Sequence, residues 1–175
     1  MARPRSSNEP PTNVRIRIAR DTDFVQCIEI THQAWPEFPE RNSIYHLFTK
    51  HFSSTSLIAE AAEGLVGFLL AFRSPAHPEL GYVHLVATRP AWQGRGIAGA
   101  LYERIFSIFR DSGCSTVRCI IDPGNKRSLN FHQAIGFRPS PTGPTIDVGG
   151  VLATRDYNGA SIHMVEMERP LESEI

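Results

Sequence analysis

Alternating apolar and polar positions predict most of the strands in this chain. Over residues 14–19, VRIRIA, the apolar side chains alternate with arginine, which is the period of a strand with one buried face. Residues 56–72 hold two apolar runs separated by Glu63 and Gly64, so they predict a hairpin that turns at the glycine. Similar patterns, bounded by glycine, serine or proline, predict further strands over residues 81–88, 115–121 and 160–168.

Apolar residues at spacings of three and four predict helices between these strands. Asp21 or Thr22 can cap a first helix, which ends at Trp35 and Pro36. Further helices are predicted over residues 44–51, from Ile97 to the stop at Ser112 and Gly113, and over residues 128–135. Because helices alternate with strands and no internal repeat is present, residues 14–175 are predicted to form one mixed α/β domain.

Composition limits the ligands and compartments worth considering. The 175 residues are 41% hydrophobic and 21% charged, and 18 basic side chains balance 18 acidic ones, so no overall field favours nucleic acid or an anionic membrane surface. Three cysteines without metal-ligand spacing indicate reduced thiols in a cytoplasmic protein that holds no metal. No apolar run reaches the roughly 18 residues of a spanning helix. Residues 1–13 lack the apolar centre of a signal peptide, and we expect them to form a disordered tail.

One stretch, RPAWQGRGIAGALYERIF at residues 89–106, places three glycines around the start of a predicted helix. Glycine inside a helix costs about 1 kcal/mol relative to alanine, so these positions need a physical reason. First-turn N–H groups have no helical partner and carry the positive end of the dipole, so they bind anions when no side chain blocks them. We expect a diphosphate on the amides of Gln93, Gly94, Arg95, Gly96, Ile97 and Ala98, with a further contact from the Arg95 side chain. In the alternative interpretation, the glycines only shape a tight loop and allow close helix packing.

Two segments resemble the GNAT acyltransferase superfamily. QGRGIA at 93–98, after a strand and Pro90, resembles its Gln/Arg-x-x-Gly-x-Gly/Ala signature, which binds the pyrophosphate of acetyl-CoA. NKRSLNFHQAIGF at 125–137 resembles the family segment that supports the pantetheine arm and often the leaving thiol. The resemblance runs from about Val14 to the last strand. It implies a mixed sheet of six or seven strands, splayed between strands four and five and flanked by about four helices.

The resemblance also implies acetyl-CoA as co-substrate and assigns residues to it. The pantetheine arm is expected in the gap of the splayed sheet, along the backbone of Val86, Ala87 and Thr88 and beside Asn125 and Phe131. Lys126 and Arg127 are candidates for the ribose phosphate, or else ordinary surface residues at a helix start.

His132 stands where many relatives carry a tyrosine that protonates the departing thiolate. An unperturbed histidine has a pKa of about 6.5, so it could donate that proton. A thiolate leaving group has a pKa near 8.5 and needs an acid less than an alkoxide does. The alternative is therefore that His132 only touches the cofactor sulfur from a helix surface.

His84 is the candidate general base, because only the neutral form of an amine attacks a thioester. Counting by twos along the strand places Tyr82, His84, Val86 and Thr88 on one face. Relatives often carry a carboxylate near position 82, and Glu79 is a second choice for the base. A histidine in a strand can instead be a hydrogen-bonded packing residue.

The expected reaction moves an acetyl group from acetyl-CoA to the amine of a small acceptor by direct attack, in a monomer or homodimer. The segment WPEFPERN, with Trp35, Glu37, Phe38 and Glu40, corresponds to a loop beside the acceptor cleft and would suit a cationic amine with an apolar body. The alternative interpretation is a solvated acidic loop. Two other functions stay open: an inactive acyl-CoA sensor, and an interaction domain without a cofactor.

Overall fold

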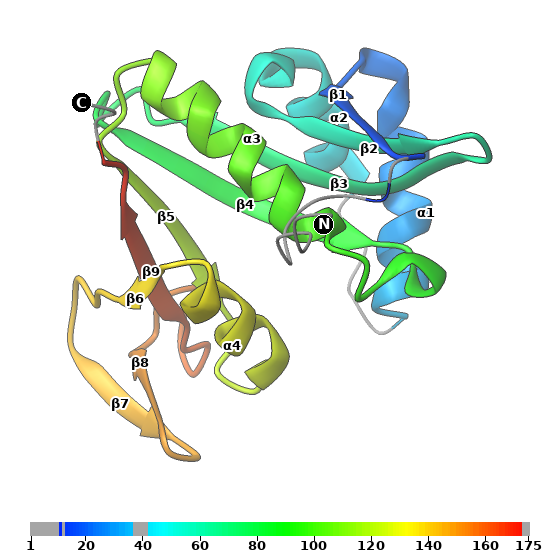
Figure 1. The fold of residues 1–175 in the computed structure, drawn as a ribbon. Helices are drawn as coiled ribbons and strands as arrows, with labels where there is room; N and C mark the ends of the chain where they lie inside the picture. Colours follow the sequence, from blue (N-terminus) through cyan, green and yellow to red (C-terminus); the bar gives the residue numbers. More distant parts are fainter. Residues whose placement is uncertain (1–10, 12, 37–41, 173–175) are drawn as a thin grey trace, which may run out of the picture.

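A twisted seven-stranded sheet forms the centre of the computed structural model, which describes residues 11, 13–36 and 42–172 (Figure 1). The strand order is β1-β2-β3-β4-β5-β9-β6, and all neighbours are antiparallel except β4 and β5. The strands are β1 (Arg15–Ile18), β2 (Leu57–Ala61), β3 (Gly64–Arg73), β4 (Leu80–Thr88), β5 (Thr116–Ile121), β6 (Arg138–Pro139) and β9 (Val165–Pro170). The predicted mixed α/β fold with a sheet of six or seven strands is confirmed.

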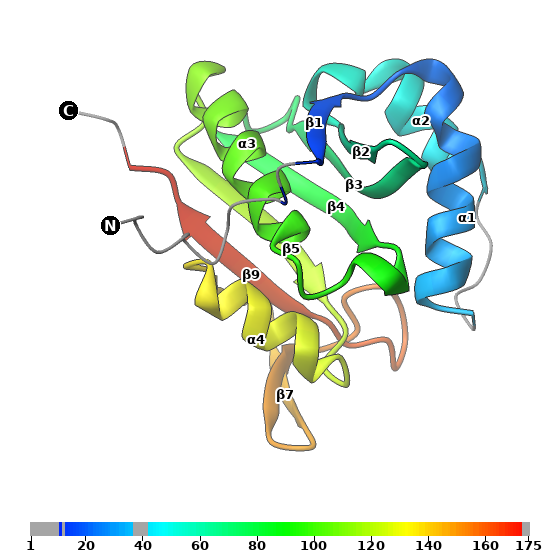
Figure 2. The same ribbon diagram turned by 45° about the vertical axis from the view of Figure 1, so that its right-hand side comes forward.

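Helices cover both faces of this sheet (Figures 1 and 2). They are α1 (Phe24–Ala34), α2 (Asn42–His51), α3 (Ile97–Asp111) and α4 (Lys126–Ala134), with short 3-10 turns at Asp21–Asp23, Ser53–Thr55 and Pro90–Trp92. Apolar residues of α3 and α4 share one core with the sheet, and those of α1 and α2 share the other. The buried stripe of α3 has the spacing read from the sequence, because Ile97, Leu101 and Ile105 lie one turn apart and all face the sheet.

Strands β4 and β5 separate part-way along their length, as the resemblance implied. They pair through three residues each, and the last pair joins Tyr82 to Arg118. Beyond Tyr82, β4 runs on to Thr88 while β5 diverges from it. This leaves backbone N–H and C=O groups of residues 83–88 without a strand partner on the β5 side.

A β-bulge at His84 overturns the prediction that four alternate residues of β4 share one face. Leu85 pairs with Leu70 and Val83 with Ala71, so His84 is an extra residue in its strand and the alternation shifts there. Tyr82 and His84 therefore face the aromatic residues of the α2 side. Val86 packs instead against the core under α3, and Thr88 lies near Ile97 on the same side.

The segment after α4 differs most from the prediction. Residues 139–150, a segment rich in proline and glycine where the sequence pattern predicts no strand, contain β7 (Thr145–Val148), which pairs with β8 (Val151–Thr154) in a separate two-stranded sheet. Gly149 and Gly150 form the turn with φ of 60° and 84°. The last strand begins at Val165 rather than at residue 160, and Ile162 is exposed on the preceding loop.

The remaining sequence-based predictions concern the cysteines, the membrane and the tail. All three cysteines are free and buried. None of the helices in the described ranges is long and apolar enough to cross a membrane. Residues 1–10 and 12 of the expected tail lie outside the described residues.

Candidate functional site

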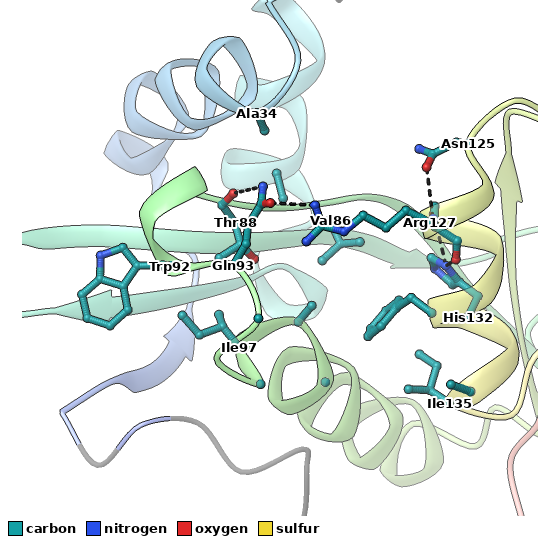
Figure 3. A pocket seen from close by; sticks show the side chains of 18 of the residues that line it. Ala34, Val86, Thr88, Trp92, Gln93, Ile97, Asn125, Arg127, His132 and Ile135 are labelled. Carbon is teal, nitrogen blue, oxygen red and sulfur yellow. Dashed lines mark hydrogen bonds between the residues drawn. The ribbon is translucent and has the colours of Figure 1, made fainter.

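A cavity of about 480 Å³ lies where β4 and β5 separate, between the end of β4, the first turn of α3 and α4 (Figure 3). It reaches Ala34 and Trp35 of the α1 side, so it extends through the gap in the sheet. The structure brings together on its wall these predicted residues: Val86, Ala87, Thr88, Gln93, Gly94, Gly96, Ile97, Ala98, Asn125, Phe131 and His132. Of the residues predicted to bind the cofactor or to act in catalysis, His84, Arg95 and Lys126 are not on this wall.

The first turn of α3 presents unpaired amides at one end of the cavity. Gly94 and Gly96 have φ of 73° and 77°, a left-handed conformation that side chains rarely adopt, so the loop shape by itself requires glycine at both positions. The first helical bond here runs from Ala100 N to Gly96 O, at 3.0 Å. The predicted amide of Gln93 is not free, because Gln93 N donates to Pro90 O at 3.2 Å. Among the described residues, no acceptor meets the amides of residues 94–99, and no acidic side chain lies in the first helical turn. These amides can therefore receive an anion, and the loop-shaping role of the glycines holds as well.

Arg95 does not point into the cavity. Its guanidinium carbon lies 4.8 Å from the centre of the Trp92 ring. The cation beside the α3 loop is instead Arg127 of α4. Its side chain extends toward this loop and donates through Nη1 to Gln93 Oε1 at 2.7 Å (Figure 3). Gln93 Nε2 in turn donates to Thr88 O at 3.4 Å. The sequence contained no signal for this bridge, since it joins residues 34 positions apart.

His132 lines the cavity, but both of its ring nitrogens already have partners. Nδ1 lies 2.7 Å from Ser128 O and Nε2 lies 2.6 Å from the Tyr102 hydroxyl. A carbonyl oxygen only accepts hydrogen bonds, so Nδ1 carries the proton, and Nε2 accepts from Tyr102. Burial lowers the pKa of His132 and outweighs the opposing effect of the bond to Ser128. The ring is therefore neutral near pH 7, and this geometry aims no His132 proton at the cavity.

His84 lies on the other side of β4 from Val86 and Thr88. Its ring stacks on Phe48 of α2, with centroids 5.0 Å apart and planes 9° apart. The other parts of the side chain are exposed, yet the covered face loses enough hydration to lower the pKa of His84. A neutral imidazole is thus available near pH 7 to accept a proton.

The other acceptor-side candidates lie elsewhere. Burial raises the pKa of Tyr82, whose phenol lies beside that of Tyr157, so Tyr82 remains protonated. Glu79 precedes β4, at the end of the strand away from the cavity, and is exposed beside His77. Trp35 lines the cavity, whereas Glu37, Phe38 and Glu40 lie outside the described residues. No group of three or more metal-ligating side chains occurs within the part of the chain that the structure describes.

The chain belongs to the acetyltransferase (GNAT) family, whose model matches residues 24–137. It is 26% identical over 137 residues to the L-2,4-diaminobutyric acid acetyltransferase of Vibrio cholerae, a match that covers 77% of this chain and 78% of that protein. It is 29% identical over 94 residues to the protein of the same name from Nocardia farcinica, covering 54% of this chain and 49% of that one. The chain spans about half the length of the first curated relatives that it matches.

Solved structures show the same fold. Diaminobutyrate acetyltransferase EctA from Paenibacillus lautus, in complex with L-2,4-diaminobutyric acid and coenzyme A, superposes with a TM-score of 0.71 at 22% identity. That match covers 94% of this chain and 99% of EctA. Ard1 from Thermoplasma volcanium gives a TM-score of 0.74 at 18% identity, covering 93% of this chain and all of that one.

Proposed function

We propose that this chain transfers an acetyl group from acetyl-CoA to the amine of a small acceptor by direct attack. The observation that carries the proposal is the set of unpaired amides at residues 94 and 96–99, which line a cavity at the point where the sheet opens. Family membership and the names of the relatives support the same reaction.

The residues on the cavity wall fit the parts of acetyl-CoA. Amides at a helix start, free of competing carboxylates, suit the pyrophosphate. The backbone of Val86, Ala87 and Thr88, which has no strand partner on the β5 side, offers hydrogen bonds to the amides of the pantetheine arm. Phe131 of α4 supplies apolar contact beside it. When bound, acetyl-CoA supplies an acetyl group activated as a thioester.

The acceptor enters from the face that carries His84, because the cofactor takes the side of β4 under α3. Its amine attacks the thioester carbonyl, the new N–C bond forms and the C–S bond breaks. The amine proton passes to the neutral His84 imidazole, directly or through a water molecule, and the departing thiolate takes up a proton to give the thiol of CoA. A covalent enzyme intermediate is not part of this scheme.

Release of CoA from acetyl-CoA over a panel of amines tests this function, with calorimetric titration of acetyl-CoA alongside. The panel includes L-2,4-diaminobutyrate, monoamines and amino acids with one amine. Turnover with any of them supports the proposal. Binding without turnover would identify an acyl-CoA sensor, and no binding would identify an interaction domain without a cofactor.

A further inference from the structure

A hydrogen-bonded chain runs from the core under α3 to the wall of the cavity, through Tyr102, His132 and Ser128. Tyr102 and His132 are 1% and 4% exposed, so each polar atom in them depends on a protein partner. The ring of Tyr102 is held among Phe106, Phe131 and Phe137, with centroids 5.5 to 5.8 Å away. Packing therefore fixes the position of Tyr102, where this hydrogen-bonded chain begins.

Donors and acceptors along this chain can be assigned from chemistry alone. Tyr102 O–H donates to His132 Nε2, and His132 Nδ1–H donates to Ser128 O. Ser128 Oγ lies 3.3 Å from His132 Nδ1 and is a second, weaker acceptor of the same N–H group. Because Nδ1 is already protonated, Ser128 cannot donate its own hydroxyl proton to the ring.

The Ser128 hydroxyl proton is thus left without an acceptor among the residues that the structure describes. Ser128 lines the cavity from α4, one turn before His132. Its backbone is also fixed, because Ser128 N donates to Asn125 Oδ1 at 3.0 Å in the cap of α4. A preorganised O–H group of this kind can stabilise negative charge that develops in front of it.

We propose that Ser128 is a catalytic residue, whose hydroxyl donates a hydrogen bond to the departing thiolate, and that His132 and Tyr102 are positioning residues that orient it. The inference rests on the proposed acetyl transfer. As the C–S bond breaks, its electron pair goes to sulfur, and the Ser128 O–H group stabilises that charge without giving up its proton. The thiolate then takes its proton from water, so His132 stays neutral throughout.

Three variants test the inference by steady-state kinetics from pH 5.5 to 9. Ser128→Ala is expected to lower kcat about 10- to 100-fold, the effect of losing a hydrogen bond to a charged group, while KM for acetyl-CoA changes less than about threefold. His132→Gln offers an acceptor to Tyr102 and a donor to Ser128, so it should retain kcat within about threefold and the wild-type pH profile. Tyr102→Phe should lower kcat by a few fold without changing the pH profile.

Ser115→Ala is the matched control, since Ser115 is exposed beyond the end of α3 and its described hydrogen bonds use only its backbone. The inference is overturned if Ser128→Ala keeps the wild-type kcat. It is also overturned if His132→Gln loses as much rate as Ser128→Ala and removes a basic limb from the pH profile, because His132 would then be the proton donor. Absence of turnover by the wild-type chain with every amine would instead contradict the proposed function itself.

Discussion

Replacing Tyr102 with phenylalanine removes one buried hydrogen bond and almost nothing else. The phenylalanine ring keeps the packing against Phe106 and Phe137, so no cavity of side-chain size forms. His132 Nε2, 2.6 Å from the lost hydroxyl, becomes a buried acceptor without a partner. Such a group costs about 1–3 kcal/mol. For a domain of this size, each kcal/mol lowers Tm by about 2–4 °C, so the expected decrease is roughly 2–12 °C.

Urea denaturation and a thermal melt at pH 7.5 measure this effect. Tyr157→Phe is the control, because Tyr157 is 39% exposed and water can take the place of the removed hydroxyl group. The free energy of unfolding of this variant should differ from that of the wild type by less than about 0.5 kcal/mol. Equal stabilities for Tyr102→Phe and the wild type would refute the reasoning, since the hydrogen bond would then contribute nothing net.

The lowered pKa of His132 provides a second test of the Tyr102–His132 pair, through the pH dependence of stability. In the unfolded chain, histidine binds a proton near pH 6.5, whereas folded His132 binds one only at lower pH. The unfolded state therefore holds more protons as pH falls below about 6.5, and the free energy of unfolding decreases there. His132→Gln should lose less stability than the wild type between pH 7 and 5. An identical loss in both proteins would show that His132 titrates normally.

Three further predictions concern the cavity and the base. Gly96→Glu should abolish acetyl-CoA binding in calorimetry, because it places a side chain with a negative charge at the unpaired amides. The control Leu152→Glu adds the same charge on the exposed β7–β8 hairpin, and this variant should bind acetyl-CoA normally. Arg127→Gln should weaken acetyl-CoA binding about three- to tenfold while its unfolding free energy changes by less than about 0.5 kcal/mol, because its bond to Gln93 is exposed. His84→Phe should lower kcat at least about 100-fold with KM for acetyl-CoA unchanged. In the wild type, kcat/KM should fall as pH drops below the pKa of His84, which lies under its ordinary value; a flat acid limb would exclude His84 as the base.

Periodicity and glycine placement were enough to predict the parts of the fold that depend on local sequence. The hairpin turning at Gly64 and the buried stripe of α3 follow from side-chain spacing, because burial on one face imposes a period on any regular element. The glycines at 94 and 96 marked the tight loop before α3 for a similar reason, since few other residues tolerate their backbone angles.

The tertiary structure decided how residues far apart in the sequence are placed relative to one another. The bulge at His84 comes from its register with β3, and it moves two residues of β4 to the opposite face from Val86. The partner of His132 is Tyr102, 30 positions away and one helix earlier, and this pairing turns an apparent proton donor into a neutral ring. Spacing along one segment specifies which face is buried, but the protonation state of a side chain depends on the atoms that packing brings to it.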